Sequence, residues 1–336
     1  MLISDYSNFV MEICQVKQII KGINLAEIRR ARERIKSFVR HTPLEASPHL
    51  SKELKTAVCL KLENLQVTGS FKPRGSLNKL LKLKPETGVI ASTAGNHGIG
   101  VAYAAKSVGL AADIYLPTWA DPHKIAKLKE YGARLRFFET VEAARETARD
   151  VAEKESLLFV SAYNDAEMIA GGGTVALEIY EDCPAVDLLV VGVGGGGFAS
   201  GIAIALKELN PSIVIIGVQA EKSPLMTRWL EAGTQIDATL EPTIAEGLAV
   251  RMEPETITFP ILREYLDGMI TVSESEIADA MRWAHTKHRM IFEPSGAATV
   301  AALRKIDLSN FQTVVGVITG QNISAARFQS IVESKN

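Results

Sequence analysis

A single lysine, Lys72, lies among small residues in the stretch Thr-Gly-Ser-Phe-Lys-Pro-Arg-Gly at positions 68–75, directly before a helical pattern. A lysine in a close-packed, partly apolar setting can have a lowered pKa, so its amine can act as a nucleophile or a base. A turn with a solvated lysine has the same composition. Taken alone, the stretch fits that plainer structure better.

A second stretch, Ser-Thr-Ala-Gly-Asn-His-Gly at positions 92–98, lies where a predicted strand gives way to a helix. Backbone amides at a helix start, with hydroxyl and amide side chains beside them, form a site for an anion. A substrate carboxylate would suit this site. An ordinary strand-to-helix turn capped by Asn96 or Ser92 is the alternative.

The third stretch, Gly-Val-Gly-Gly-Gly-Gly-Phe at positions 192–198, follows an apolar strand and opens a helix. Its four consecutive glycines, Gly194, Gly195, Gly196 and Gly197, leave the backbone amides unshielded, so a phosphate can approach closely. Glycine costs roughly 0.5–1 kcal/mol relative to alanine inside an element, which makes a purely structural reason for the run a poor one. The stretch therefore predicts a phosphate site.

The same stretch also satisfies the pattern Gly-x-Gly-x-x-Gly through Gly192, Gly194 and Gly197, which is formally a dinucleotide fingerprint. A full fingerprint has an acidic residue at the end of the next strand, about 20 residues on. Here Gln219 occupies the position directly after that strand, and Glu221 comes late. An NAD-dependent oxidoreductase is therefore the weaker alternative.

Alternating strands and helices must position these three stretches. Apolar and alternating runs predict strands at 57–63, 88–93, 112–116, 135–138, 188–193, 213–218 and 313–319. Helical spacing of apolar residues predicts helices at 23–39, 98–108, 123–131, 141–153, 199–209, 224–232 and 274–288. This order predicts an α/β fold with parallel sheets covered by helices on both faces.

The composition narrows the class of protein further. The 336 residues carry 37 Lys and Arg against 39 Asp and Glu, a net charge of −2, so nucleic acid is not expected as a partner. No apolar run approaches the ~18 residues of a membrane span, and the first residues lack the pattern of a signal peptide. Three widely spaced cysteines give no disulfide framework and no metal-binding motif. We expect a cytoplasmic protein without a membrane association.

Taken together and in this order, the three stretches resemble the fold-type II pyridoxal-phosphate enzymes, most closely the group of threonine/serine dehydratases (ammonia-lyases) and serine racemases. The resemblance extends from about Ile23 to Ser324. Four further segments support it: Ile-Ala-Gly-Gly-Gly-Thr at 169–174, Ile-Ala-Glu-Gly at 244–247, Glu-Pro-Ser-Gly-Ala at 293–297 and Thr-Gly-Gln-Asn at 319–322.

The resemblance implies roles for residues around pyridoxal 5'-phosphate. Lys72 would hold the cofactor as a Schiff base and move the Cα proton, Phe71 would pack beside the ring, and Asn96 would bond its hydroxyl. The four glycines Gly194, Gly195, Gly196 and Gly197 would bind the phosphate. Thr319 would face the ring nitrogen, and Glu293 would lie near the ring or have a structural role.

The resemblance also implies a substrate site. Thr93, Gly95, Asn96 and His97 would hold the substrate carboxylate. Arg145 lies where some relatives have an arginine near that carboxylate, although a solvated helix face is the commoner role of such a residue.

Departures from the family's patterns bear on activity. The serine that racemases of this group use is Ala94 here, which disfavours racemisation. Gln219 and Leu225 stand where some relatives have cation-binding carboxylates, so we expect no metal site and no strong activation by magnesium or calcium. Changes at three further positions put the choice of substrate side chain in doubt: Gly172, Phe198 and Gln321.

The resemblance thus implies a two-domain, tryptophan-synthase-β-like fold, with a large cofactor domain of residues 1–75 and 162–336 and a small domain of residues 76–161. The implied reaction is dehydration and deamination of L-threonine or L-serine, by a dimer or tetramer. A larger substrate, such as hydroxyaspartate or a hydroxyectoine-derived compound, stays open. So do a serine racemase and a non-catalytic amino-acid sensor, although a sensor has no need for Lys72.

Overall fold

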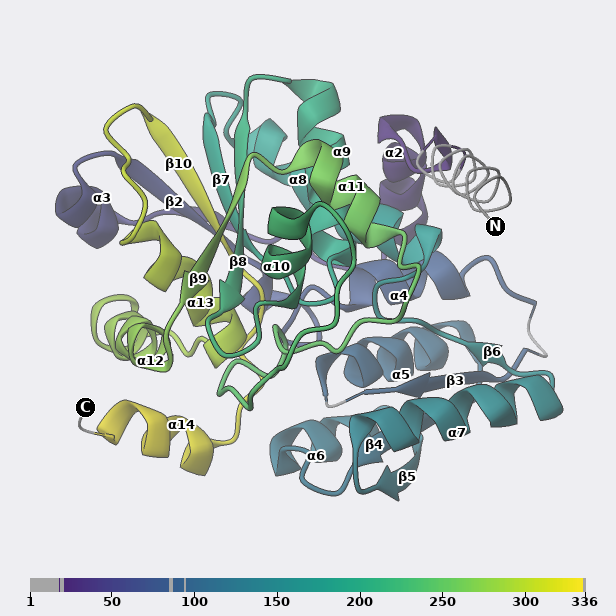
Figure 1. The fold of residues 1–336 in the computed structure, drawn as a ribbon. Coiled ribbons are helices and arrows are strands. Elements are labelled where there is room, and N and C mark those ends of the chain that lie inside the picture. The colour runs from purple at the N-terminus through teal and green to yellow at the C-terminus, as the bar shows by residue number, and fades with distance from the viewer. Residues whose placement is uncertain (1–17, 19–20, 85–86, 94, 335–336) are drawn as a thin grey trace, which may run out of the picture.

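The computed structural model describes residues 18, 21–84, 87–93 and 95–334. Its larger sheet has six strands in the order β1-β2-β10-β7-β8-β9 (Figure 1). All neighbours in this sheet are parallel except β1 and β2. The strands are β1 (Leu44–Ala46), β2 (Ala57–Leu62), β7 (Leu188–Gly192), β8 (Val214–Ala220), β9 (Gly268–Val272) and β10 (Thr313–Ile318).

The smaller sheet has four parallel strands in the order β5-β4-β3-β6. They are β3 (Val89–Ser92), β4 (Ala112–Pro117), β5 (Arg134–Phe138) and β6 (Leu158–Phe159). These strands follow one another along the chain, whereas those of the larger sheet come from before and after them.

The helices that cover the sheets and the short helical turns are as follows: α2 (Leu25–Ile35), α3 (Pro48–Leu54), the 3₁₀ turn η1 (Glu63–Leu65), α4 (Pro73–Leu80), α5 (Asn96–Val108), α6 (Pro122–Glu130), α7 (Val141–Lys154), α8 (Ala166–Asp182), α9 (Gly197–Leu209), α10 (Leu225–Ala232), α11 (Thr258–Tyr265), α12 (Glu274–Trp283), the π-helical turn η2 (Ala284–His288), α13 (Pro294–Leu303) and α14 (Ala325–Glu333). None of those within the described residues is long and apolar enough to cross a bilayer.

The larger sheet buries both of its faces, because side chains of a strand alternate between them. In β7, Leu189 and Val191 join the core cluster formed with α8 and α9, whereas Leu188 and Val190 join the one formed with α12 and α13. The smaller sheet is likewise packed between α5 on one face and α7 on the other (Figure 1). The prediction of an α/β fold with mixed sheets and helices on both faces is confirmed.

The sequence patterns missed several elements and misplaced some ends. α8 was not predicted, although it is 17 residues long, and neither were α13 and β9. α5 begins at Asn96, two residues earlier than expected, and the helix predicted to run to His288 ends at Trp283 in a π-helical turn. The early start of α5 matters, because it turns Asn96 and His97 into the first residues of a helix.

Candidate active site

Lys72 lies at the junction of the two sheets, where the loop after η1 enters α4. The backbone N–H of Phe71 donates to the carbonyl of Thr319 at 3.2 Å, which joins this loop to the end of β10. On the other side, α5 presses against Lys72, since a Cβ placed on Gly100 would lie 2.9 Å from the Lys72 Cβ. Lys72 is thus fixed between the larger sheet and the first turns of α5.

The Lys72 ammonium has no hydrogen bond or ion pair among the described residues. Its Nζ lies 4.8 Å from the ring centroid of Phe71, which stacks on Phe198 at 3.8 Å. Burial lowers the pKa of Lys72 to about 8, and the Glu293 carboxylate opposes this shift. At pH 7, about one such lysine in ten is neutral, compared with about one in 3,000 at the usual pKa of 10.5. This amine suits nucleophilic or base chemistry.

The four glycines predicted to bind phosphate form the turn between β7 and α9. None of the N–H groups of residues 194–199 donates to an acceptor in the described part of the chain. A side chain would not fit here: a Cβ on Gly194 would lie 2.4 Å from the Gly247 carbonyl, and one on Gly195 would lie 2.4 Å from the Tyr163 ring. Gly196 has φ +87°. The unbonded amides at a helix N-terminus fit a phosphate group.

Asn96, Glu293 and Asn322 form a chain of side-chain contacts. Asn96 Nδ2 donates to Glu293 Oε1 at 2.6 Å, and Asn322 Nδ2 donates to Asn96 Oδ1 at 2.7 Å. Burial raises the pKa of Glu293, against the opposing charge of Lys124. The structure therefore brings three sequence motifs, at positions 96, 293 and 322, into direct contact.

The loop predicted to bind a carboxylate forms the N-terminus of α5. The Gly95 N–H donates to Thr93 Oγ1 at 2.8 Å. The N–H groups of residues 96–98 donate to no acceptor among the described residues. The buried His97 ring contacts the Val160 carbonyl through Nε2 at 2.9 Å, and burial together with the charge of Lys72 lowers the pKa of His97 to about 3. His97 is therefore neutral, and its backbone N–H is what it presents to an anion.

Thr319 lies at the end of β10, buried, with its carbonyl bonded to Phe71. Its hydroxyl makes no hydrogen bond within the described ranges. Gly320 follows it because a Cβ there would lie 2.1 Å from Glu293 Oε1. The hydroxyl of Thr319 is thus free to donate to a ligand.

Arg145 contacts a different part of the chain. Its Nη1 donates to the Arg251 carbonyl at 3.1 Å and lies 3.7 Å from Glu253 Oε1. Arg145 makes no hydrogen bond or ion pair with residues 93 or 95–97 in the described structure, so its role near the substrate stays a prediction. Ala94, on which the expectation about racemisation depends, lies outside the described residues.

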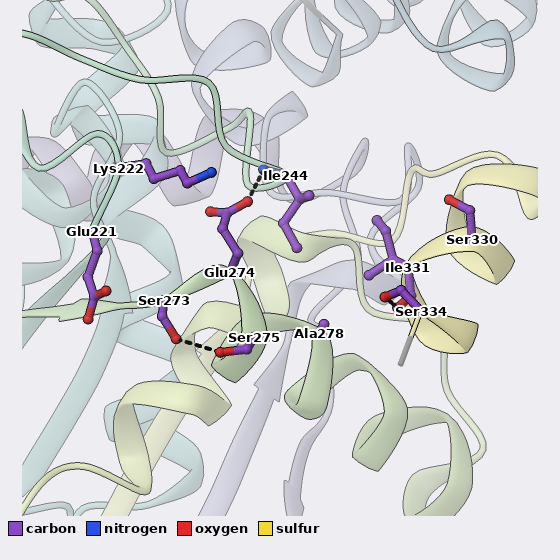
Figure 2. A pocket seen from close by; sticks show the side chains of 10 residues that line it. All are labelled: Glu221, Lys222, Ile244, Ser273, Glu274, Ser275, Ala278, Ser330, Ile331 and Ser334. Carbon is purple, nitrogen blue, oxygen red and sulfur yellow. Dashed lines mark hydrogen bonds between the residues drawn. The ribbon is translucent and has the colours of Figure 1, made fainter. Parts of the chain in front are cut away.

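The positions that disfavour a metal site are engaged in packing. Gln219 Oε1 accepts hydrogen bonds from the backbone and the hydroxyl of Thr227, and Leu225 is buried. Glu221 lies 3.5 Å from Lys305 and lines a cavity of about 540 Å³ beside Lys222 and Glu274 (Figure 2). Across the described residues, no three His, Cys, Asp or Glu side chains come together to hold a metal ion. The expectation about magnesium and calcium stays a prediction.

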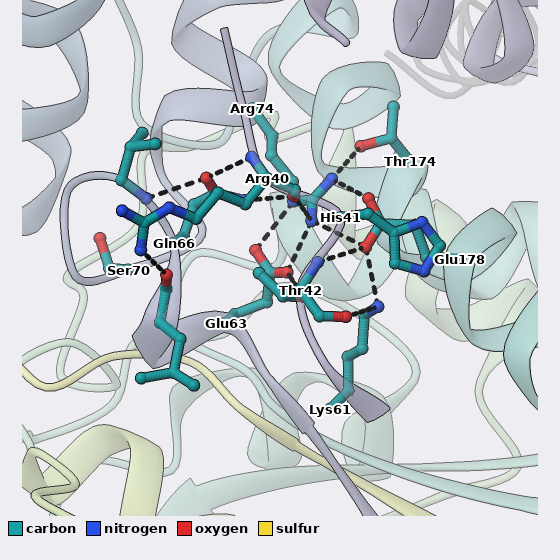
Figure 3. A network of polar contacts seen from close by, with 12 residues as sticks. Arg40, His41, Thr42, Lys61, Glu63, Gln66, Ser70, Arg74, Thr174 and Glu178 are labelled. Carbon is teal, nitrogen blue, oxygen red and sulfur yellow. Dashed lines mark hydrogen bonds and ion pairs between the residues drawn. The ribbon is translucent and has the colours of Figure 1, made fainter. Parts of the chain in front are cut away.

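A second polar cluster is centred on Arg74, which follows Lys72 by two residues in the sequence. Figure 3 shows this cluster. Arg74 is 1% exposed and bonds two carboxylates, Glu63 at 2.7 and 2.8 Å and Glu178 at 2.6 and 3.0 Å. The buried Lys61 contacts Glu178 at 2.7 Å and the Thr42 carbonyl at 2.6 Å. These carboxylates raise the pKa of Arg74. The cluster ties α4 to β2 and α8.

Sequence reasoning missed three residues of this region. Tyr163 packs against Gly195 and Gly197, Asn322 bonds Asn96, and Lys124 lies against Gly95. Asn322 belongs to the recognised segment 319–322, which was the available signal for it. Tyr163 and Lys124 stand outside the recognised segments, and only the folded chain brings them to the site.

Comparisons with known proteins agree with this geometry. Residues 35–320 match the family model described as pyridoxal-phosphate dependent enzyme. The chain is 40% identical over 315 residues to the L-threonine ammonia-lyase of Thermotoga maritima, covering 92% of this chain and 78% of that protein. It is 35% identical over 312 residues to the L-threo-3-hydroxyaspartate ammonia-lyase of a Pseudomonas species, and the match covers 91% of this chain and 98% of that protein. Maize serine racemase has a similar structure, with a TM-score of 0.87 and 29% identity; the match covers 91% of this chain and 96% of the racemase.

Proposed function

The chain belongs to the family of pyridoxal-phosphate dependent enzymes, and we propose that it dehydrates and deaminates a β-hydroxy amino acid, L-threonine or L-serine, to a 2-oxo acid and ammonia. One observation carries the proposal. Lys72, whose pKa is lowered to about 8, lies against the first turns of α5. Among the described residues, its amine has no bonded partner and the N–H groups of residues 96–98 have no acceptor. Because this family uses pyridoxal phosphate, the alternative of an NAD-dependent oxidoreductase is rejected.

The described residues would supply partners for the aldehyde, the phosphate and the ring nitrogen of the cofactor. Lys72 Nζ would hold it covalently, and the amides of residues 194–197 would bind its phosphate. The Thr319 hydroxyl would donate a hydrogen bond to its ring nitrogen. Bound there, pyridoxal phosphate withdraws electrons from the substrate, which makes the Cα proton acidic. A hydroxyl partner cannot protonate the ring as an aspartate would, and this weaker withdrawal suits prompt loss of the β-hydroxyl.

The residues then divide the work on the substrate. The backbone amides of residues 96–98 bind the carboxylate and orient Cα toward Lys72. The neutral amine of Lys72 takes the Cα proton, and the β-hydroxyl takes up one proton and leaves as water. The substrate thus loses one proton and one hydroxide in total. Hydrolysis of the released enamine gives the 2-oxo acid and ammonia.

Two further activities are supported by specific observations. The relative that is named for L-threo-3-hydroxyaspartate supports a larger substrate, which Gly172, Phe198 and Gln321 would accommodate. The similarity to maize serine racemase supports racemisation. The alanine at position 94 argues against racemisation, because it has no proton to give.

A substrate panel tests the proposal. The pyridoxal-phosphate-loaded protein is incubated with L-threonine, L-serine and L-threo-3-hydroxyaspartate, and 2-oxo acid, ammonia and D-serine are measured. We expect 2-oxo acid and ammonia in equal amounts from at least one substrate and no accumulation of D-serine. The absence of 2-oxo acid with all three would refute the elimination, and accumulation of D-serine would establish the racemase.

The remaining expectations are part of the same proposal. The large domain comprises residues 1–75 and 162–336, and the small domain comprises residues 76–161. The protein is a cytoplasmic homo-oligomer, a dimer or a tetramer, with a small amino acid rather than nucleic acid or a membrane as its partner. Limited proteolysis and light scattering test the division and the oligomeric state.

A further inference from the structure

Lys124 is a buried lysine that lies against the loop proposed to hold the substrate carboxylate. It belongs to the first turn of α6 and is 8% exposed. A Cβ placed on Gly95 would lie 2.3 Å from Lys124 Cδ and 3.1 Å from its Nζ. The absence of a side chain at Gly95 therefore lets Lys124 bring its ammonium to this loop.

The Lys124 ammonium has only a long ion pair as its polar contact among the described residues. It makes no hydrogen bond among the described residues, and its ion pair with Glu246 Oε2 is long, at 3.6 Å. Glu246 bonds more closely to another cation, with Arg327 Nη1 2.5 Å from its Oε1. These three side chains line one small cavity together with Glu293 and Asn322. An ammonium without a hydrogen bond to the described residues has unused donors, so an anion that reaches it gains charge-assisted hydrogen bonds.

Among the described residues, the other candidate cations for a carboxylate at this loop are neutral or bonded elsewhere. His97 is neutral, since the pKa of His97 is lowered to about 3. Arg145 is engaged with Arg251 and Glu253. The amides of residues 96–98 supply hydrogen bonds but no full charge. Lys124 is the charged donor that the structure places against Gly95.

We propose that Lys124 binds the α-carboxylate of the substrate, exchanging its long contact with Glu246 for a hydrogen-bonded ion pair. This inference rests on the proposed function, because it takes an amino acid as the ligand. Lys124 acts from α6, which packs on the smaller sheet, whereas Lys72 lies at the edge of the larger one. The smaller sheet then binds the substrate carboxylate through Lys124, and the larger sheet contacts its Cα through Lys72.

A matched pair of ligands isolates the contact. L-alanine has the amino and carboxylate groups but no hydroxyl to eliminate, and ethylamine is the same molecule without the carboxylate. Calorimetry gives the dissociation constant of each for the holoenzyme and for Lys124→Met. We expect alanine to bind the variant about 10- to 100-fold more weakly, as for loss of a charged hydrogen bond. Ethylamine should bind both proteins within about twofold.

Two variants serve as controls. Lys124→Arg keeps the charge and should recover most of the affinity for alanine. Lys129→Met removes an exposed charge from the same helix and should match the wild type. Equal weakening of alanine and ethylamine would overturn the proposal, and so would unchanged binding of alanine. Because no turnover is involved, the result stands apart from the success or failure of the elimination assay.

Discussion

Lys72 and Arg74 are two cations, two residues apart, that the fold treats in opposite ways. Arg74 is enclosed by Glu63 and Glu178, with four short hydrogen bonds and a raised pKa. Lys72 has no bonded partner among the described residues and a pKa lowered to about 8. Arg74 is therefore fully hydrogen-bonded and stays charged, whereas the Lys72 amine loses its proton more easily and can react.

The contrast shows how one short loop serves both stability and chemistry. A buried charge is tolerated when carboxylates surround it, and removing its partners is strongly destabilising. A lysine held without partners loses its proton more easily and becomes a better nucleophile. The Arg74 cluster fixes the start of α4, and Lys72 directly precedes that helix.

Replacing Arg74 should have the largest effect on stability. Arg74→Met leaves Glu63 and Glu178 buried with less compensation, and we expect the free energy of unfolding to fall by about 3–5 kcal/mol. Denaturant unfolding measures this. Arg30→Met removes an exposed ion pair with Glu27 and should cost at most about 0.5 kcal/mol. Equal losses in the two variants would contradict the role given to the Arg74 cluster.

Replacing Glu178 should have a smaller effect that depends on pH. Arg74 and Lys61 lower the pKa of Glu178 below its usual 4.5, although burial opposes them. This carboxylate therefore stabilises the fold above about pH 4.5, and its contribution is lost as the pH falls through the lowered pKa. Glu178→Gln should cost about 1–3 kcal/mol at pH 7. The difference from the wild type should shrink below pH 4.5, and a constant difference down to pH 3 would contradict the account.

The lowered pKa of Lys72 predicts a modest pH dependence of cofactor capture. Only the neutral amine attacks an aldehyde, so uptake of pyridoxal phosphate by the cofactor-free protein should quicken about fivefold from pH 7 to pH 8. The rate should level off above about pH 9. Stopped-flow absorbance measures it. A rate that keeps rising tenfold per pH unit to pH 10 would show an ordinary lysine.

Periodicity predicted the fold class but missed α8, which packs closely against α4 and α9. The strand at 188–193 was recognised because its apolar, β-branched run is covered on both faces. α8 was missed because Gly171, Gly172 and Gly173 interrupt its pattern and favour a loop. In the fold, a Cβ on Gly171 would lie 2.5 Å from the Arg74 carbonyl, and one on Gly173 would lie 2.7 Å from the Gly201 carbonyl. The glycines allow α4 and α9 to approach α8 closely, which only the tertiary structure reveals.

In the candidate site, too, some residues could be predicted from the sequence and others could not. Lys72 and the four glycines are conspicuous in sequence because their types and order are unusual. The contacts of Asn96 with Glu293 and Asn322 join residues about 200 positions apart, and no local pattern encodes them. Lys124 is an ordinary lysine on an amphipathic helix. Its importance comes from its burial and from the glycine it lies against, which are properties of the folded chain.

The central claim is that Lys72 performs the chemistry while its neighbours hold it in place. The most direct test is 2-oxo acid release from L-threonine by the cofactor-loaded wild type and by Lys72→Ala, with the unfolding free energy of both proteins measured. We predict that the variant loses activity by at least about 10³-fold. Its stability should stay within about 1 kcal/mol of the wild type, because Lys72 makes no ion pair with any described residue. Release of 2-oxo acid at the wild-type rate by a folded Lys72→Ala protein would contradict the account.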